Sequence, residues 1–80
     1  MVINIKITGS LSDALDEAKA SIEAVGGYFE GDTTNGEFSG KGVEGTYIVY
    51  GGKSLTVLIS KKPFFASESK IESKIRDFFE

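Results

Sequence analysis

Three glycines, Gly40, Gly42 and Gly45, have the G-x-G-x-x-G spacing of a dinucleotide-binding fingerprint. That chemistry needs a strand, a tight turn and then a helix whose N-terminus faces the pyrophosphate. Here the glycines are followed by alternating apolar and polar residues, which are typical of a strand. We therefore interpret them as residues that bend a strand or leave room for a helix, and we expect no nucleotide cofactor.

The chain offers few other groups for catalysis. Gly52-Lys53-Ser54 matches the end of a phosphate-binding loop, but Tyr47 stands where that motif needs its first glycine. Histidine and cysteine are absent, which excludes the common catalytic triads, zinc sites and thiol nucleophiles. The acidic residues nearest to one another are Asp13, Asp16 and Glu17, and Glu30, Asp32 and Glu37. Because neither group has the apolar surroundings that raise a carboxyl pKa, we expect no enzyme activity and no metal site.

Two pairs of adjacent phenylalanines are the main candidates for binding. Phe64-Phe65 follows Lys61-Lys62-Pro63 directly, and Phe78-Phe79 lies near the end of the sequence. Core packing would account for one ring of each pair, but neighbouring side chains on a helix diverge by about 100°. We therefore expect at least one ring of each pair to be partly exposed, as an apolar contact for a surface, a protein partner or self-association.

Composition narrows the class of protein. Eighty residues, 40% of them hydrophobic, suffice for a single domain spanning residues 1–80. The net charge of −3 argues against nucleic acid, since proteins that bind it usually carry a basic face. No apolar run approaches the roughly 20 residues that span a bilayer, and the first residues alternate, unlike a signal peptide. The expected location is the cytoplasm.

Two stretches have helical periodicity. The first is capped by Ser10 or Ser12 and ends at Gly26-Gly27, where glycine takes the left-handed conformation cheaply. The second begins between Phe64 and Ser67 and runs to the end of the sequence. In both stretches apolar residues recur every three or four positions, which gives each helix one apolar stripe. The stripes are Leu11, Leu15, Ala18, Ile22 and Val25 in the first, and Ile71, Ile75, Phe78 and Phe79 in the second.

The remaining segments are predicted strands. Residues 2–8 alternate, and short strands are expected at 27–31 and 37–40. A polar turn at 32–36 separates these two, with Asn35-Gly36 suited to positive φ. A bulge or bend is expected at 40–42 before the strand that starts at Val43. Pro63 ends the last strand because it cannot donate to the ladder.

The two strands around Gly51-Gly52 also predict their own register. A two-residue turn would split their apolar side chains between both faces of the sheet, whereas a three-residue turn puts them on one face. Burial of one face therefore favours the three-residue turn. The pairs it predicts are Gly45 with Ile59, Tyr47 with Val57 and Val49 with Leu55.

Together these elements predict an α+β domain of order β-α-β-β-β-β-α, with a five-stranded antiparallel sheet and two helices on one of its faces. A curved sheet that grips a helix also leaves room for an apolar pocket, and small Gly45 beside Tyr47 is where we expect it to open. The leading hypothesis is a non-enzymatic module that binds an apolar surface or a protein partner. The alternative is a domain that binds a small, lipid-like ligand.

The second half of the chain has a wider pattern. It consists of Phe38-x-Gly40-x-Gly42-Val43-x-Gly45, the alternating Tyr47, Val49, Leu55, Val57 and Ile59, then Pro63 and Ile71-Glu72-x-x-Ile75. This pattern resembles the polyhydroxyalkanoic acid system proteins, small bacterial proteins associated with polyester storage granules. The chain departs from that family at Thr8-Gly9, where the family has Pro-His, and in a shorter link to Phe38. The resemblance implies the same fold and an association with storage granules.

Overall fold

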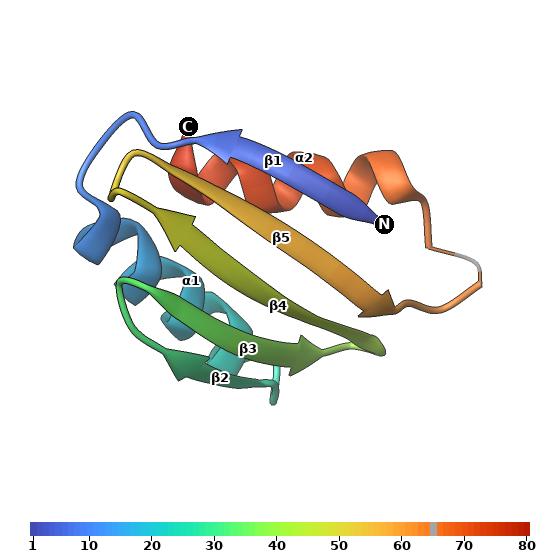
Figure 1. The fold of residues 1–80 in the computed structure, drawn as a ribbon. Helices are drawn as coiled ribbons and strands as arrows, with labels where there is room; N and C mark the ends of the chain where they lie inside the picture. The colour runs from blue at the N-terminus through green and yellow to red at the C-terminus, as the bar shows by residue number, and fades with distance from the viewer. Residues whose placement is uncertain (65) are drawn as a thin grey trace.

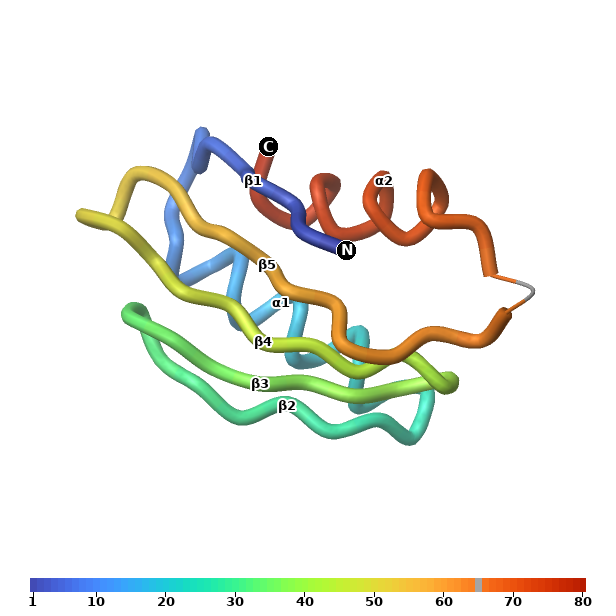
Figure 2. The backbone as a smooth tube through the Cα atoms, turned by 45° about the vertical axis from the view of Figure 1, so that its right-hand side comes forward, coloured from blue at the N-terminus to red at the C-terminus, as the bar shows by residue number. Residues whose placement is uncertain are grey.

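The computed structural model describes residues 1–64 and 66–80 and has the predicted order of elements. The elements are β1 (Val2–Lys6), α1 (Leu11–Ala24), β2 (Tyr28–Gly31), β3 (Asn35–Gly40), β4 (Val43–Tyr50), β5 (Ser54–Lys61) and α2 (Glu68–Phe79). The strands form one antiparallel sheet in the order β1-β5-β4-β3-β2. Both helices lie on the same face of this sheet, α1 beside β2 and β3 and α2 beside β1 (Figures 1 and 2). The predicted α+β architecture is therefore confirmed.

The register of the β4–β5 hairpin is the one that burial predicts. Val49 pairs with Leu55 and Tyr47 with Val57. The turn closes through a hydrogen bond from Lys53 N to Tyr50 O of 3.1 Å. Its two glycines take positive φ, which residues with a Cβ rarely adopt. The sheet face under the helices is consequently apolar and buried, and it forms the core with side chains from both helices. The core consists of Ile3, Ile5, Ala14, Leu15, Tyr47, Leu55, Val57, Ile59 and Phe79.

Helix α1 begins and ends much as its sequence predicts. Ser10 is the N-cap, and its Oγ accepts a hydrogen bond from Asp13 N at 3.2 Å. The helix ends at Ala24, and Gly26 follows with a φ of +80°. Val25, which the predicted stripe includes, lies beyond the last helical residue and is half exposed. The buried part of the stripe is therefore confined to the first two-thirds of the helix.

Two glycine predictions are wrong in detail. Residues 40–42 form a tight β3–β4 turn with Lys41 and Gly42 at positive φ, in place of a bulge or bend. The irregularity in pairing lies later, between Glu44 and Gly45 where β4 faces β5. Gly36 belongs to strand β3 and does not take a positive φ.

The β2–β3 turn is organised by Asp32. Its Oδ1 accepts hydrogen bonds from Thr34 N, Thr34 Oγ1 and Asn35 N at 2.8, 2.6 and 3.1 Å. An aspartate that satisfies the backbone of the following residues fixes a turn without positive φ. These hydrogen bonds lower the pKa of Asp32, and the one from the Thr34 hydroxyl has the largest effect.

Gly31 and Gly36 are required for a long-range reason. They pair with each other across β2 and β3, and a Cβ on either would overlap the Tyr47 ring or hydroxyl. The ring stacks on Phe29 with centroids 5.8 Å apart. Tyr47 Oη also donates a hydrogen bond of 2.8 Å to Asp32 O. Burial raises the pKa of Tyr47, and the charge of Asp32 adds to the effect. Tyr47, on β4, therefore contacts β2 through its ring and the β2–β3 turn through its hydroxyl.

Candidate functional site

The connection between β5 and α2 presents an aromatic side chain to solvent. Phe64 is 96% exposed, the most exposed large hydrophobic residue in the described part of the chain. It lies in a turn that is closed by a hydrogen bond from Ala66 N to Pro63 O of 3.0 Å. The connection extends past the end of the sheet (Figure 1). Phe65, the other predicted member of this pair, lies outside the described residues.

Short contacts hold the base of this connection. Pro63 packs over Gly42, where an added Cβ would lie 2.9 Å from the proline Cγ. Lys62 Nζ donates a hydrogen bond of 3.4 Å to Ala66 O. Lys61 Nζ lies 3.7 Å from a carboxylate oxygen of Glu44, an exposed pair of small energetic value. The connection is therefore supported at its base by the β3–β4 turn, while the Phe64 side chain projects.

The exposure of Phe64 has a different cause from the predicted one. Helix α2 is capped at Ser67 and starts at Glu68, so Phe64 precedes the helix. The divergence of about 100° between helical neighbours therefore does not apply to it. Its place in a projecting turn accounts for its exposure.

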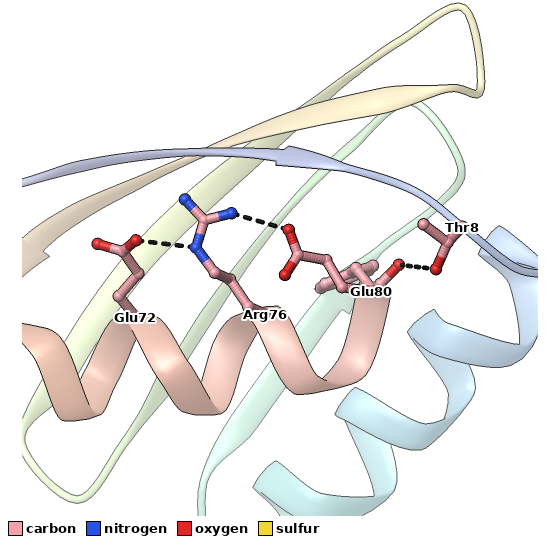
Figure 3. A network of polar contacts seen from close by, with 5 residues as sticks. Thr8, Glu72, Arg76 and Glu80 are labelled. Carbon is pink, nitrogen blue, oxygen red and sulfur yellow. Dashed lines mark hydrogen bonds and ion pairs between the residues drawn. The ribbon is translucent and has the colours of Figure 1, made fainter.

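The second phenylalanine pair belongs mostly to the core. Phe79 is 7% exposed, and Phe78 is half-buried against the core cluster. Thr8 ties this end of α2 to β1, with its N and Oγ1 donating to Phe79 O at 3.1 and 3.4 Å (Figure 3). Phe78 is therefore the partly exposed ring expected of this pair, whereas Phe79 is ruled out as an exposed contact because its ring fills the space between α2 and the sheet.

Helix α2 is also stabilised along its own length. Arg76 donates to Glu72 at 2.8 Å and to Glu80 at 2.9 Å, one turn before and one turn after it (Figure 3). The hydrogen bond to Glu72 is the main cause that raises the pKa of Arg76. Solvent-accessible pairs at this spacing add only modestly to the stability of a helix. The C-terminal part of α2 is thus stabilised by the ion pairs of Arg76 and by the buried ring of Phe79.

The predicted pocket is very small and does not open at Gly45. An apolar cavity of about 40 Å³ lies between the sheet and the two helices. Its lining consists of Ala18, Ile22, Phe29, Phe38, Tyr47, Leu55, Val57, Ile75, Phe78 and Phe79. The space beside Gly45 is filled by the Phe38 ring and by Leu58 O, each 2.7 Å from where a Cβ would stand. Since ligand sites usually measure about 300–1,000 Å³, the cavity has room for little more than a methyl group.

A further surface was not predicted from the sequence. Several large apolar side chains point away from both helices, on the open face of the sheet, and are 41–59% exposed. They are Val2, Tyr28, Ile48, Tyr50 and Leu58. Ile48 also lines a hollow of about 670 Å³, together with Glu30 and Glu37. The available signal was that Ile48 and Leu58 occupy positions that the alternation assigns to the solvent face.

Tyr28 joins the two carboxylates of this face. Its hydroxyl donates to Glu30 and lies 3.4 Å from Glu37 Oε1. The hydrogen bond to Glu30 is the main cause that raises the pKa of Tyr28 to about 12. The phenol is therefore protonated at neutral pH and remains a donor to the acidic pair. Within residues 1–64 and 66–80, no three acidic side chains are grouped closely enough to hold a metal ion.

Comparisons with protein-family models, with curated proteins and with solved structures find no match for the chain. Among the described residues, neither helix has the length and apolar character needed to cross a membrane. Function is therefore inferred from the two exposed features above, the Phe64 turn and the open face of the sheet.

Proposed function

We propose that this protein is a non-enzymatic binding module that associates with an apolar surface through the β5–α2 connection. The observation that carries the proposal is the Phe64 side chain, 96% exposed on a turn whose base is held by Pro63 and Lys62. Burying a phenylalanine ring contributes about 1.5–3 kcal/mol. The apolar area that Phe64 exposes to water is the contact that we propose for an external apolar phase.

The neighbouring lysines suit the same role. Lys61, which is exposed, and Lys62, which is half-buried and donates to Ala66 O, precede the turn in the chain. Long basic side chains lay their methylenes on apolar material while the ammonium group stays in water. One aromatic ring flanked by two lysine side chains should attach the protein weakly and reversibly. Stable anchoring to a membrane generally takes two anchoring groups. Many copies on one surface would therefore exchange with protein in solution.

The resemblance to polyhydroxyalkanoic acid system proteins suggests which apolar surface is relevant. Polyester storage granules present a water-insoluble polymer, and the residues from Phe38 onward that carry the resemblance build β3, β4, β5 and α2. These elements frame the Phe64 turn. Granule association is thus the specific form of the proposal.

The proposal is tested by co-pelleting with polyhydroxybutyrate particles. Phe64→Ser should lower the affinity for the particles about tenfold or more, because the lost ring burial of about 1.5–3 kcal/mol corresponds to at least that factor. Its thermal unfolding should match that of the unmodified protein, since the ring is almost fully exposed. Val25→Ser, at an apolar position 50% exposed beyond α1, is the matched control and should pellet normally. Equal pelleting of all three proteins would contradict the proposal.

A lipid-like ligand is the second candidate, and the all-apolar cavity under α2 is its support. Because that cavity measures about 40 Å³, an acyl chain enters only if α2 moves away from the sheet. Phe78 and Ile75, both half-buried at its rim, would then cover the chain.

A further inference from the structure

The open face of the sheet carries a polarised row of side chains. Successive cross-strand pairs join Val2 to Leu58, Leu58 to Thr46, Thr46 to Glu37 and Glu37 to Glu30. One line across all five strands therefore runs from two apolar residues through a threonine to two carboxylates. Every member of this row is exposed.

The apolar end of the row is part of a larger stripe. Ile48 pairs with Thr56, so it lies diagonally beside Leu58, and Tyr50 follows two residues later on the same face. Diagonal neighbours on one face of a sheet are about 7–8 Å apart, within reach of long side chains. Leu58, Ile48 and Tyr50 are 41%, 43% and 55% exposed. The stripe thus crosses β5 and β4, and its member Ile48 lines the same hollow as Glu30 and Glu37.

The acidic end of the row is electrostatically unfavourable by itself. Glu30 and Glu37 stand directly opposite each other on β2 and β3, an arrangement that destabilises a sheet when both side chains are charged. The ion pairs found among the described residues are those of Lys61 and Arg76, and neither involves these two carboxylates. Tyr28 supplies a single neutral O–H, which donates to Glu30 and lies 3.4 Å from Glu37 Oε1. A cationic group placed over the pair would remove the repulsion.

We propose that this face docks a basic amphipathic helix of a protein partner, with apolar side chains on Leu58 and Ile48 and lysine or arginine over Glu30 and Glu37. Leu58 and Glu37 are two strands apart, about 10 Å. That distance equals about two turns of a helix lying across the strands. The partner therefore carries its cationic residues about seven positions from its apolar anchor, the spacing of helix-in-groove recognition.

The same charges disfavour other occupants. Anionic lipid headgroups and nucleic acid would meet two uncompensated carboxylates. A second copy related by a two-fold axis would place the carboxylates opposite each other or opposite Val2 and Leu58, and both arrangements are unfavourable. This docking surface is also separate from the Phe64 turn. The docking proposal can therefore be tested independently of the proposed association with an apolar surface.

The test is an NMR titration of isotope-labelled protein with an amphipathic helical peptide of leucine and lysine. A matched peptide has glutamate at each lysine position. The lysine peptide should shift the amides of Glu30, Glu37, Thr46 and Leu58 saturably, and the glutamate peptide should not. Glu30→Gln with Glu37→Gln should weaken the affinity about 2- to 30-fold, the loss expected for two exposed charge pairs.

Two controls distinguish lost recognition from lost structure. Asp16→Asn with Glu17→Gln removes the same charge from the exposed side of α1 and should leave the affinity within about twofold, as for charges remote from a docking site. The Glu30/Glu37 variant should unfold at the same temperature as the parent or higher, because it relieves a like-charge pair. Leu58→Thr, which keeps a good strand residue, should weaken binding independently of charge.

Three results would overturn the docking proposal. The first is equal binding of both peptides, and the second is a set of shifts centred on residues 61–64 and α2. The third is a shift of the open-face amides with protein concentration alone, which would make a second copy the occupant.

Discussion

Replacing Tyr47 with alanine is expected to lower the free energy of unfolding by about 3–5 kcal/mol, the range for deleting a buried aromatic ring. The side chain is 3% exposed, stacks on Phe29 and covers Gly31 and Gly36. Its hydroxyl also bonds to Asp32 O across the β2–β3 turn. Because small domains have about 5–15 kcal/mol of stability in total, the variant should be close to unfolding at physiological temperature.

Tyr50 provides the matched control for this prediction. It lies three residues further along the same hairpin, points to the open face and is 55% exposed. Tyr50→Ala should change stability by less than about 1 kcal/mol. Tyr47→Phe keeps the ring and should cost only about 0.5–1.5 kcal/mol, the contribution of the lost hydrogen bond. Urea unfolding followed by circular dichroism measures all three, and similar losses for Tyr47→Ala and Tyr50→Ala would refute the assigned faces.

Replacing Phe79 with alanine should also cost about 3–5 kcal/mol. Its ring is the buried side chain of α2 and lies between that helix and the sheet. Phe64→Ala should stay within about 0.5 kcal/mol, as exposed positions usually do. Amide exchange in α2 should accelerate in the Phe79 variant more than exchange in β4, because the helix loses its main anchor.

Phe64, Phe78 and Phe79 thus make a graded series. Phe78→Ala should fall between the other two described substitutions, since Phe78 is half-buried. If Phe79→Ala retains wild-type stability, or if Phe64→Ala unfolds several kcal/mol more easily, the assignment of core and surface rings is wrong.

Local periodicity was sufficient to predict the architecture. Alternation on both sides of Gly51-Gly52 identified the β4–β5 hairpin, and the need to bury Tyr47 and Val57 on one face selected its register. Ser10, one of two predicted caps, and Gly26-Gly27 marked the ends of α1 because capping depends on residues only a few positions apart. Such signals are contained within short stretches of sequence.

Contacts between residues far apart in the sequence could not be predicted from these local patterns. The local sequence predicts a turn glycine at Gly36, whereas Gly36 makes room for Tyr47, eleven positions later on the neighbouring strand. The sequence likewise predicts the opening of a pocket at Gly45, whereas the Phe38 ring fills the space beside it. A glycine in the sequence shows where a Cβ is missing, but it does not show which distant side chain fills the space that is left.

The candidate surfaces were predicted only in part. Phe64 was identified as a contact from its pairing with lysines and a second ring, although its turn was expected to be helical. The opposition of Glu30 and Glu37 becomes visible only when the β2–β3 register is known. The open face was therefore missed, because its significance depends on side chains from all five strands.

The central claim, that Phe64 enters an apolar phase, is tested most directly by fluorescence of a Phe64→Trp variant. The chain contains no tryptophan, so this single residue reports on its own surroundings. On addition of polyhydroxybutyrate particles, we predict a shift of the emission maximum to shorter wavelength and protection from acrylamide quenching. Protein that pellets with the particles while emission and quenching stay as in water would contradict the account.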